Sequence, residues 1–125
     1  MNSANVASVM QALSTQPELA VDGFRHVTRH GPFPPTEAEF AASRAKFLDE
    51  RYLRQIETAC AYYRGFGIDT RSGSYGLKHR VERWGASQAG LVGYVTNGCA
   101  IVAAVMCGYK VIREKNSPNC RFKKL

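Results

Sequence analysis

Apolar residues recur at helical spacing along most of the chain, and this pattern predicts a mainly helical fold. A first helix is expected over residues 4–13, with Ser3 as its N-cap. A second is expected over about 17–29, because Pro17 suits the first turn of a helix. The stretch GPFPP at 31–35 then breaks any helix.

The clearest helical pattern begins at Thr36, which can form a capping box with Glu39. The apolar positions that follow keep mostly to one side of a helix expected over 37–64. A break near Asp49 is an open alternative. The next stretch, 65–74, is rich in Gly and Ser and is expected to be a loop.

The helix expected over about 75–84 has an apolar stripe and a basic face. Ser74 can cap it, and Leu77, Val81 and Trp84 lie within one narrow stripe. We interpret Trp84 as part of the core rather than as a base-stacking residue. The cationic side chains lie opposite or beside the stripe, which indicates a surface that the helix presents to a partner.

A helix over about 97–107, ended by Gly108, is apolar all round. Thr96 or Asn97 can cap it. We therefore expect this helix to be central and buried. Its length of about 16 Å falls well short of the roughly 30 Å of a bilayer core, so it is not expected to span a membrane.

The last segment, 110–125, is basic and holds the strong turn signal NSPN between two alternating stretches. A small β-hairpin is expected there, and a flexible basic tail is the alternative. The sequence as a whole predicts one compact, mainly α domain over residues 1–125, with about five helices and a C-terminal β-hairpin.

The positive charge of the chain is concentrated in its second half. The whole chain carries 17 basic and 10 acidic side chains, for a formal net charge of +7. Residues 1–63 hold six basic against seven acidic side chains, whereas residues 64–125 hold eleven against three. A basic half favours an anionic partner, which could be nucleic acid, an acidic protein or an anionic surface. A basic surface that serves only solubility is the plainer interpretation.

Four cysteines are present, and none forms a CxxC pair. Cys99 and Cys107 would lie about 12 Å apart on one helix, which is too far for a disulfide. The N-terminal stretch MNSANVASVM has no basic region and no long apolar run, so no signal peptide is expected. These features favour a cytoplasmic protein with reduced thiols.

Histidine-based chemistry is only weakly indicated. His26 and His30 have the i,i+4 spacing of two metal ligands on a helix, but no third ligand stands at a motif spacing. His79 with Glu82, Tyr75 or Asp69 could act in acid–base catalysis, yet no nucleophile motif or phosphate-binding loop accompanies it. We expect no catalytic residue, no metal and no cofactor. A small enzyme of unrecognised reaction is kept as an alternative.

Nucleic-acid binding is the more natural use of the basic side chains, because each can neutralise a phosphate. A helix-turn-helix is not expected, because the helix at 97–107 offers no side chain able to read a base edge. The basic helix and the tail are the expected contacts. The candidate residues for binding nucleic acid or another partner are Arg71, Lys78, His79, Arg80, Arg83, Lys110, Arg113, Lys115, Arg121, Lys123 and Lys124.

The second half also contains a set of short motifs: SYGLKH at 74–79, Glu82, YVTNG at 94–98, Ala103–Ala104, Gly108–Tyr109 and SPN at 117–119. This set resembles a pattern found in small proteins of phages, plasmids and their bacterial hosts. Helix caps, a helix stop and a turn account for much of it, but not for Lys78 and His79. The resemblance implies no catalytic or ligand residues, and it favours an accessory protein of a mobile element.

Two hypotheses from different classes follow. The first is a small basic protein that binds DNA or RNA without catalysis and whose affinity falls steeply with salt. The second is a phage-type inhibitor of a host defence complex, similar to anti-CRISPR proteins, that acts by binding one protein target. The oligomeric state and the identity of the partner are not readable from the sequence.

Overall fold

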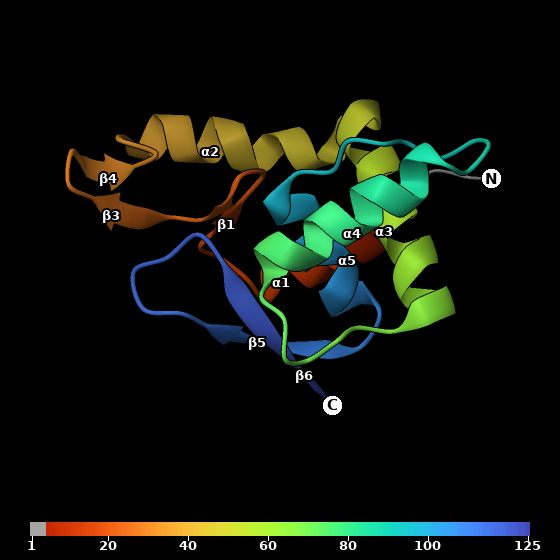
Figure 1. Cartoon of the computed structure of the whole chain (residues 1–125). Helices are drawn as coiled ribbons and strands as arrows, with labels where there is room; N and C mark the ends of the chain where they lie inside the picture. The colour runs from red at the N-terminus through yellow and green to blue at the C-terminus, as the bar shows by residue number, and fades with distance from the viewer. Residues whose placement is uncertain (1–4) are drawn as a thin grey trace.

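The computed structural model describes residues 5–125, and the fold is mainly helical (Figure 1). The five α-helices of this part are α1 (Val6–Ser14), α2 (Glu37–Ala45), α3 (Glu50–Phe66), α4 (Ser74–Ala86) and α5 (Asn97–Met106). The strands form three antiparallel hairpins: β1 (Leu19–Ala20) with β2 (Gly23–Phe24), β3 (His26–Thr28) with β4 (Gly31–Phe33), and β5 (Tyr109–Arg113) with β6 (Cys120–Lys124). The prediction of about five helices followed by a hairpin is confirmed.

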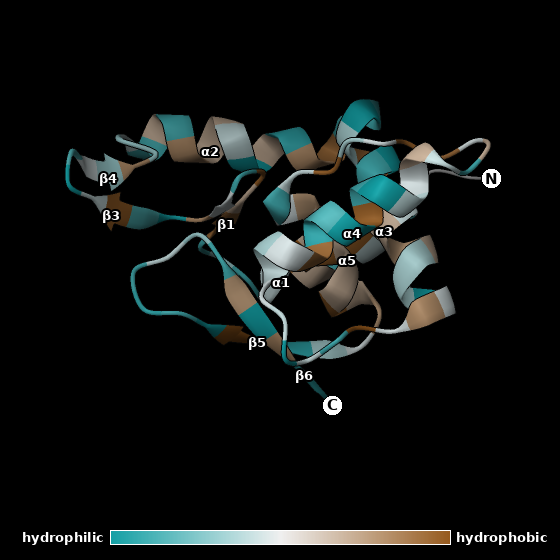
Figure 2. Ribbon diagram, in the orientation of Figure 1, coloured by the Kyte–Doolittle hydropathy of each residue, from teal (hydrophilic) through white to brown (hydrophobic). Residues whose placement is uncertain are grey.

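The helix α5 lies at the centre of the fold, behind α4 in the view of Figure 1. It begins at Asn97 because the Thr96 hydroxyl accepts a hydrogen bond from the Cys99 N–H at 3.1 Å. Its residues from Asn97 to Ala104 are buried, and α3 packs most extensively against it. Figure 2 shows hydrophobic colours along this helix. The prediction of a central, buried helix is confirmed.

No helix within residues 5–125 is both long enough and apolar enough to cross a lipid bilayer.

The start of the described chain agrees with the predicted helix at 4–13 over the residues of α1. Asn5 caps α1 by accepting a hydrogen bond from the Ser8 N–H at 3.2 Å, while the predicted cap Ser3 lies outside the described residues. At the other end of α1, the Arg44 guanidinium donates to the Leu13 carbonyl at 2.7 Å. The same carbonyl also accepts a hydrogen bond from the Gln16 N–H at 2.9 Å, so the bond from Arg44 adds a second donor and fixes α2 to the end of α1.

The helix predicted over 17–29 is wrong. The segment instead forms the hairpin β1–β2 and the strand β3. Gly23 has a φ of +122°, a conformation that a helix does not contain and that L side chains rarely adopt. The next N–H, that of Phe24, donates to the Pro118 carbonyl at 3.0 Å. Hydrogen bonds to a distant turn therefore replace the helical ones, and tertiary context overrides the apolar spacing.

The long helix predicted over 37–64 breaks at Asp49, which was the open alternative. The Thr36 hydroxyl accepts a hydrogen bond from the Glu39 N–H at 3.1 Å and so starts α2. A 3-10 turn, η1 (Lys46–Leu48), separates α2 from α3. Its middle residue, Phe47, is completely buried, so the turn carries the chain into the core before α3 begins.

The hairpin β5–β6 packs against the start of α4. Ser74, predicted as the cap of this helix, is instead its first residue, and Gly73 occupies the N-cap position. The Ser74 hydroxyl accepts a hydrogen bond from the Cys120 N–H at 3.1 Å. The cap prediction is therefore wrong, because the Ser74 oxygen serves a strand far along the chain. The residues at 110–125 form this hairpin rather than a flexible tail.

Candidate functional site

The outward face of the β5–β6 hairpin is basic. Lys110 lies directly opposite Lys123, and Ile112 lies opposite Arg121. All four side chains are exposed, and the Arg121 Nε lies 3.5 Å from a carboxylate oxygen of Glu114. Like charges that face each other across a hairpin are destabilising, and neither lysine has an acidic partner in the described part of the chain. A bound anion would relieve this repulsion.

The loop between α3 and α4 runs along the edge of this hairpin (Figure 1). Gly67, at one end of the loop, lies near the Tyr109 hydroxyl, and Gly73, at the other end, lies near the Cys120 carbonyl. Arg71 stands in this loop and its side chain is 91 % exposed. The loop therefore brings a further cation to the border of the hairpin.

Asp69 is shared between two arginines. Its Oδ1 accepts hydrogen bonds from the Arg71 N–H at 3.0 Å and from the Arg71 Nε at 3.2 Å, while its Oδ2 lies 3.8 Å from Nη1 of Arg80. The backbone bond from Arg71, and after it the side-chain bond, lower the pKa of Asp69. Because one carboxylate faces two guanidinium groups, a positive charge is left over. Arg83 on α4 is exposed and has no ion-pair partner among residues 5–125.

Lys78 is occupied inside the fold. Its side chain is only 14 % exposed, and its ammonium donates to the Glu82 carboxylate at 3.3 Å and to the Val95 carbonyl at 3.2 Å. Its neighbour His79 is about half exposed, with Nδ1 3.2 Å from a Glu82 carboxylate oxygen. The His79 ring also packs edge-on against Tyr75, with ring centroids 4.5 Å apart. Lys78 therefore holds α4 to the segment before α5, and His79 borders the exposed face.

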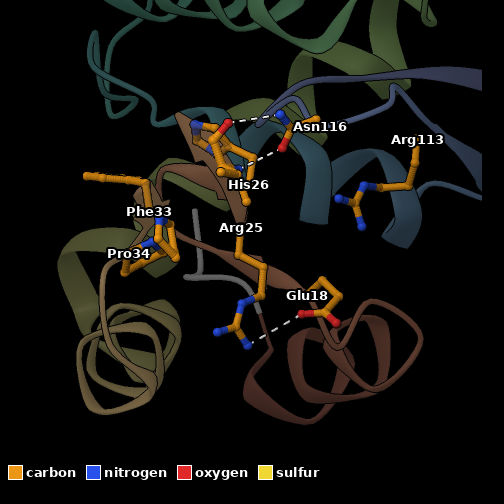
Figure 3. A pocket seen from close by; sticks show the side chains of 9 residues that line it. Glu18, Arg25, His26, Phe33, Pro34, Arg113 and Asn116 are labelled. Carbon is orange, nitrogen blue, oxygen red and sulfur yellow. Dashed lines mark hydrogen bonds and ion pairs between the residues drawn. The ribbon is translucent and has the colours of Figure 1, made fainter. Parts of the chain in front are cut away.

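Arg113 lies on the other side of the hairpin from Lys110 and Lys123. Its guanidinium lies over the Phe24 ring, 4.0 Å from the ring centroid. It lines a cavity of about 440 Å³ between β3–β4 and the β5–β6 turn, across from Phe33 (Figure 3). Arg113 thus belongs to a different surface from the other cations of the hairpin.

The structure therefore divides the predicted candidates. Lys115 is exposed in the turn between β5 and β6, and Lys124 is exposed at the end of β6. Six exposed cations lie on the outward face of the hairpin, in the α3–α4 loop and on α4, and we name them the basic surface: Arg71, Arg80, Arg83, Lys110, Arg121 and Lys123.

A second cavity, which the sequence pattern does not reveal, lies where the short motifs meet, and we name it the motif cavity. Its volume is about 300 Å³, and its walls include Tyr75 from SYGLKH, Tyr94 and Asn97 from YVTNG, and Pro118 and Asn119 from SPN. The motif set itself was the available signal. Three segments that are distant in sequence contribute residues of that set to one hollow.

The two histidines considered as metal ligands do not form a helical pair. His26 lies in β3, with its Nδ1 3.0 Å from the Phe24 carbonyl oxygen. His30 lies in the turn that follows, where its Nε2 accepts a hydrogen bond from Arg29 at 3.3 Å. Among the described residues, no group of three or more His, Cys, Asp or Glu side chains is arranged to hold a metal ion.

Trp84, expected in the core, is only partly buried. Its ring lies 5.6 Å from that of Tyr62 and 5.9 Å from that of Phe66. Phe66 itself is 65 % exposed. The three rings form an aromatic cluster at the surface, between the end of α3 and α4.

No protein-family model, curated protein or solved structure gives a significant match to this chain. The basic surface and the motif cavity are therefore the features of the molecule that indicate its function.

Proposed function

We propose that this chain is a small, non-enzymatic protein of mobile-element type that binds nucleic acid through its basic surface. The phosphate backbone is recognised mainly by basic side chains that neutralise it and release its counterions. Such binding needs exposed, uncompensated cations, and it needs no catalytic constellation. A reducing compartment such as the cytoplasm fits the four cysteines, which are all free.

The observation that carries the proposal is the opposition of Lys110 and Lys123 on the exposed face of a two-stranded hairpin. A cross-strand lysine pair weakens the hairpin in the free protein. Arg83 likewise lacks an acidic partner among the residues described. Uncompensated charge at these positions supports a polyanionic partner, because a phosphate between the two ammonium groups turns the repulsion into attraction.

One feature favours a protein target as the second candidate. Ile112 is 46 % exposed and stands between the cations of the hairpin face. An apolar residue within a charged rim is common where two proteins dock. A phage-type inhibitor of a host defence complex, similar to anti-CRISPR proteins, would use this face against an acidic surface.

The test is binding of the purified, nuclease-treated protein to a random duplex and to single strands at low and high salt. The decisive variant is the double charge reversal Lys110→Glu with Lys123→Glu, which keeps the like-charge opposition across the hairpin. Its matched control is Arg29→Glu with Lys46→Glu, two exposed cations outside the basic surface that carry the same change in charge.

We expect the wild type and the control to bind with an affinity that falls steeply with salt, and the hairpin variant to lose most of it. Equal losses in both variants would mean that only net charge matters. No binding by the wild type at low salt would overturn the proposal and favour the protein target.

A further inference from the structure

The motif cavity has two exposed aromatic walls. Tyr75 is 56 % exposed and Tyr94 is 57 % exposed, and both line the same hollow of about 300 Å³. Each ring is supported from one side, Tyr75 by the edge of His79 at 4.5 Å and Tyr94 by the Lys78 ammonium at 5.7 Å. Supported aromatic rings at a cavity mouth are suited to stack on a flat ring.

Asn97, one of the residues that line the cavity, has a side-chain acceptor without a donor within residues 5–125. Asn97 is only 7 % exposed, and its Nδ2 donates to the Pro118 carbonyl at 3.0 Å and to Oδ1 of Asn119 at 2.9 Å. Both partners are acceptors, so the orientation of the amide is fixed. Its Oδ1 is buried and receives no hydrogen bond from the described residues. A buried acceptor without a donor is costly, and it favours a ligand that brings an N–H.

The charges around the cavity argue against an anion inside it. The Lys78 ammonium is held by Glu82 at 3.3 Å, and Asp22 adds an exposed carboxylate to the lining. The unpaired cation of α4, Arg83, and the partly neutralised Arg80 belong to the basic surface instead. The cavity is therefore suited to a neutral, flat ring with N–H donors, while phosphates keep to the cations of the basic surface.

We propose that this cavity takes one unstacked nucleobase carrying an exocyclic amino group, from a single strand whose phosphates follow the basic surface. The inference rests on the proposed nucleic-acid binding and names its substrate more closely. The base stacks on Tyr94 or between Tyr94 and Tyr75, and its amino group donates toward Asn97 Oδ1. A paired base within a duplex is stacked on its neighbours and does not enter.

The test compares oligo(dC) with oligo(dT) of equal length at one low salt concentration. Both are pyrimidine strands, but only cytosine carries an exocyclic amino group. The variants are Tyr94→Ala, Tyr94→Phe, which keeps the ring, and Phe66→Ala, which removes an exposed ring outside the cavity. Thermal melting of each variant establishes that it is folded.

We expect the wild type to bind oligo(dC) at least about fivefold more tightly than oligo(dT). Tyr94→Ala should lose about fivefold or more in affinity for oligo(dC), whereas Tyr94→Phe and Phe66→Ala keep it. The slope of affinity against salt should stay unchanged in all variants, because no phosphate contact is removed.

Two adverse outcomes are distinguishable. Equal wild-type affinity for the two strands, or equal affinity of Tyr94→Ala and wild type for oligo(dC), overturns the base site while the basic surface stands. No binding to any strand overturns the proposed function and the base site together.

Discussion

Glu82 on α4 accepts a hydrogen bond from the backbone N–H of Val95 at 3.0 Å. The carbonyl of the same Val95 accepts a hydrogen bond from the Lys78 ammonium at 3.2 Å. Lys78 and Glu82, one helical turn apart, therefore satisfy the carbonyl and the N–H of Val95, a residue that lies in no strand. Since Val95 is completely buried, this arrangement fixes the segment that carries Tyr94 to the helix that carries Tyr75.

Replacing Glu82 by Ala should destabilise the fold by about 1–3 kcal/mol, because the Val95 N–H loses its acceptor and the half-buried Lys78 ammonium loses its carboxylate partner. Urea unfolding followed by circular dichroism measures the change. The control is Arg83→Ala at the next, exposed position, where a change within about 0.5 kcal/mol is expected. Equal stability of the two variants would contradict this account of Glu82.

The four thiols should differ sharply in reactivity toward iodoacetamide. The neighbouring Cys60 thiol lowers the pKa of Cys107 below its usual value, whereas burial raises the pKa of Cys99 to about 12 and that of Cys120 to about 12. The thiolate is the reactive form, and its fraction rises as the pH increases through the pKa. Alkylation of Cys107 should therefore accelerate at a lower pH than alkylation of an ordinary free thiol, and well below the pH needed for Cys99 or Cys120.

Mass spectrometry of peptides after short exposure locates the modified residue, and Cys107→Ser is the control. Rapid modification of Cys99 or Cys120 in the folded protein would contradict the burial seen here.

The burial of a helix could be predicted from the sequence where the helix's own apolar pattern determines its packing. The pattern of α5 indicates burial on all sides, and α5 is buried along nearly its whole length. The helix predicted over 17–29 failed because its backbone hydrogen bonds go elsewhere, as at Phe24, which donates to Pro118 at 3.0 Å. Apolar spacing carries no information about such distant partners. The prediction of Ser74 as a helix cap was wrong for the same reason, because the Ser74 hydroxyl accepts its hydrogen bond from the distant Cys120 N–H.

The sequence shows which residues of the candidate site are cationic, but it does not show which of them are exposed or lie side by side. The sequence indicates that Lys78 pairs with Glu82 one turn along, but it does not indicate Val95, 17 residues away, which draws Lys78 into the fold. Nor does it reveal that Arg113 stacks on Phe24. Only strand register shows that Lys110 faces Lys123, and that opposition is the strongest indication of an anionic partner.

Reversing the charges of Arg80 and Arg83 should abolish nucleic-acid binding and leave the melting temperature nearly unchanged. Arg83 has no ion pair within residues 5–125, and the Arg80–Asp69 pair is long, at 3.8 Å, and partly exposed, so neither contributes much to stability. Fluorescence anisotropy with a labelled single strand and thermal melting test the two halves of this prediction. A large fall in melting temperature would mean that these arginines are structural.

The single variant Lys110→Glu should separate stability from binding. Opposite Lys123 it replaces a repulsive cross-strand pair by an attractive one, so the free energy of unfolding should rise by roughly a few tenths of a kcal/mol. The same change removes a phosphate contact and adds a repulsive one, so affinity for a strand should fall, with a shallower dependence on salt. Chemical unfolding and strand binding are measured on the same preparation at low salt, where exposed charges act most strongly. A Lys110→Glu variant that is more stable and binds less well is the result expected if the lysine pair contacts an anionic partner. A variant that binds as well as wild type would show that the hairpin does not contact the strand.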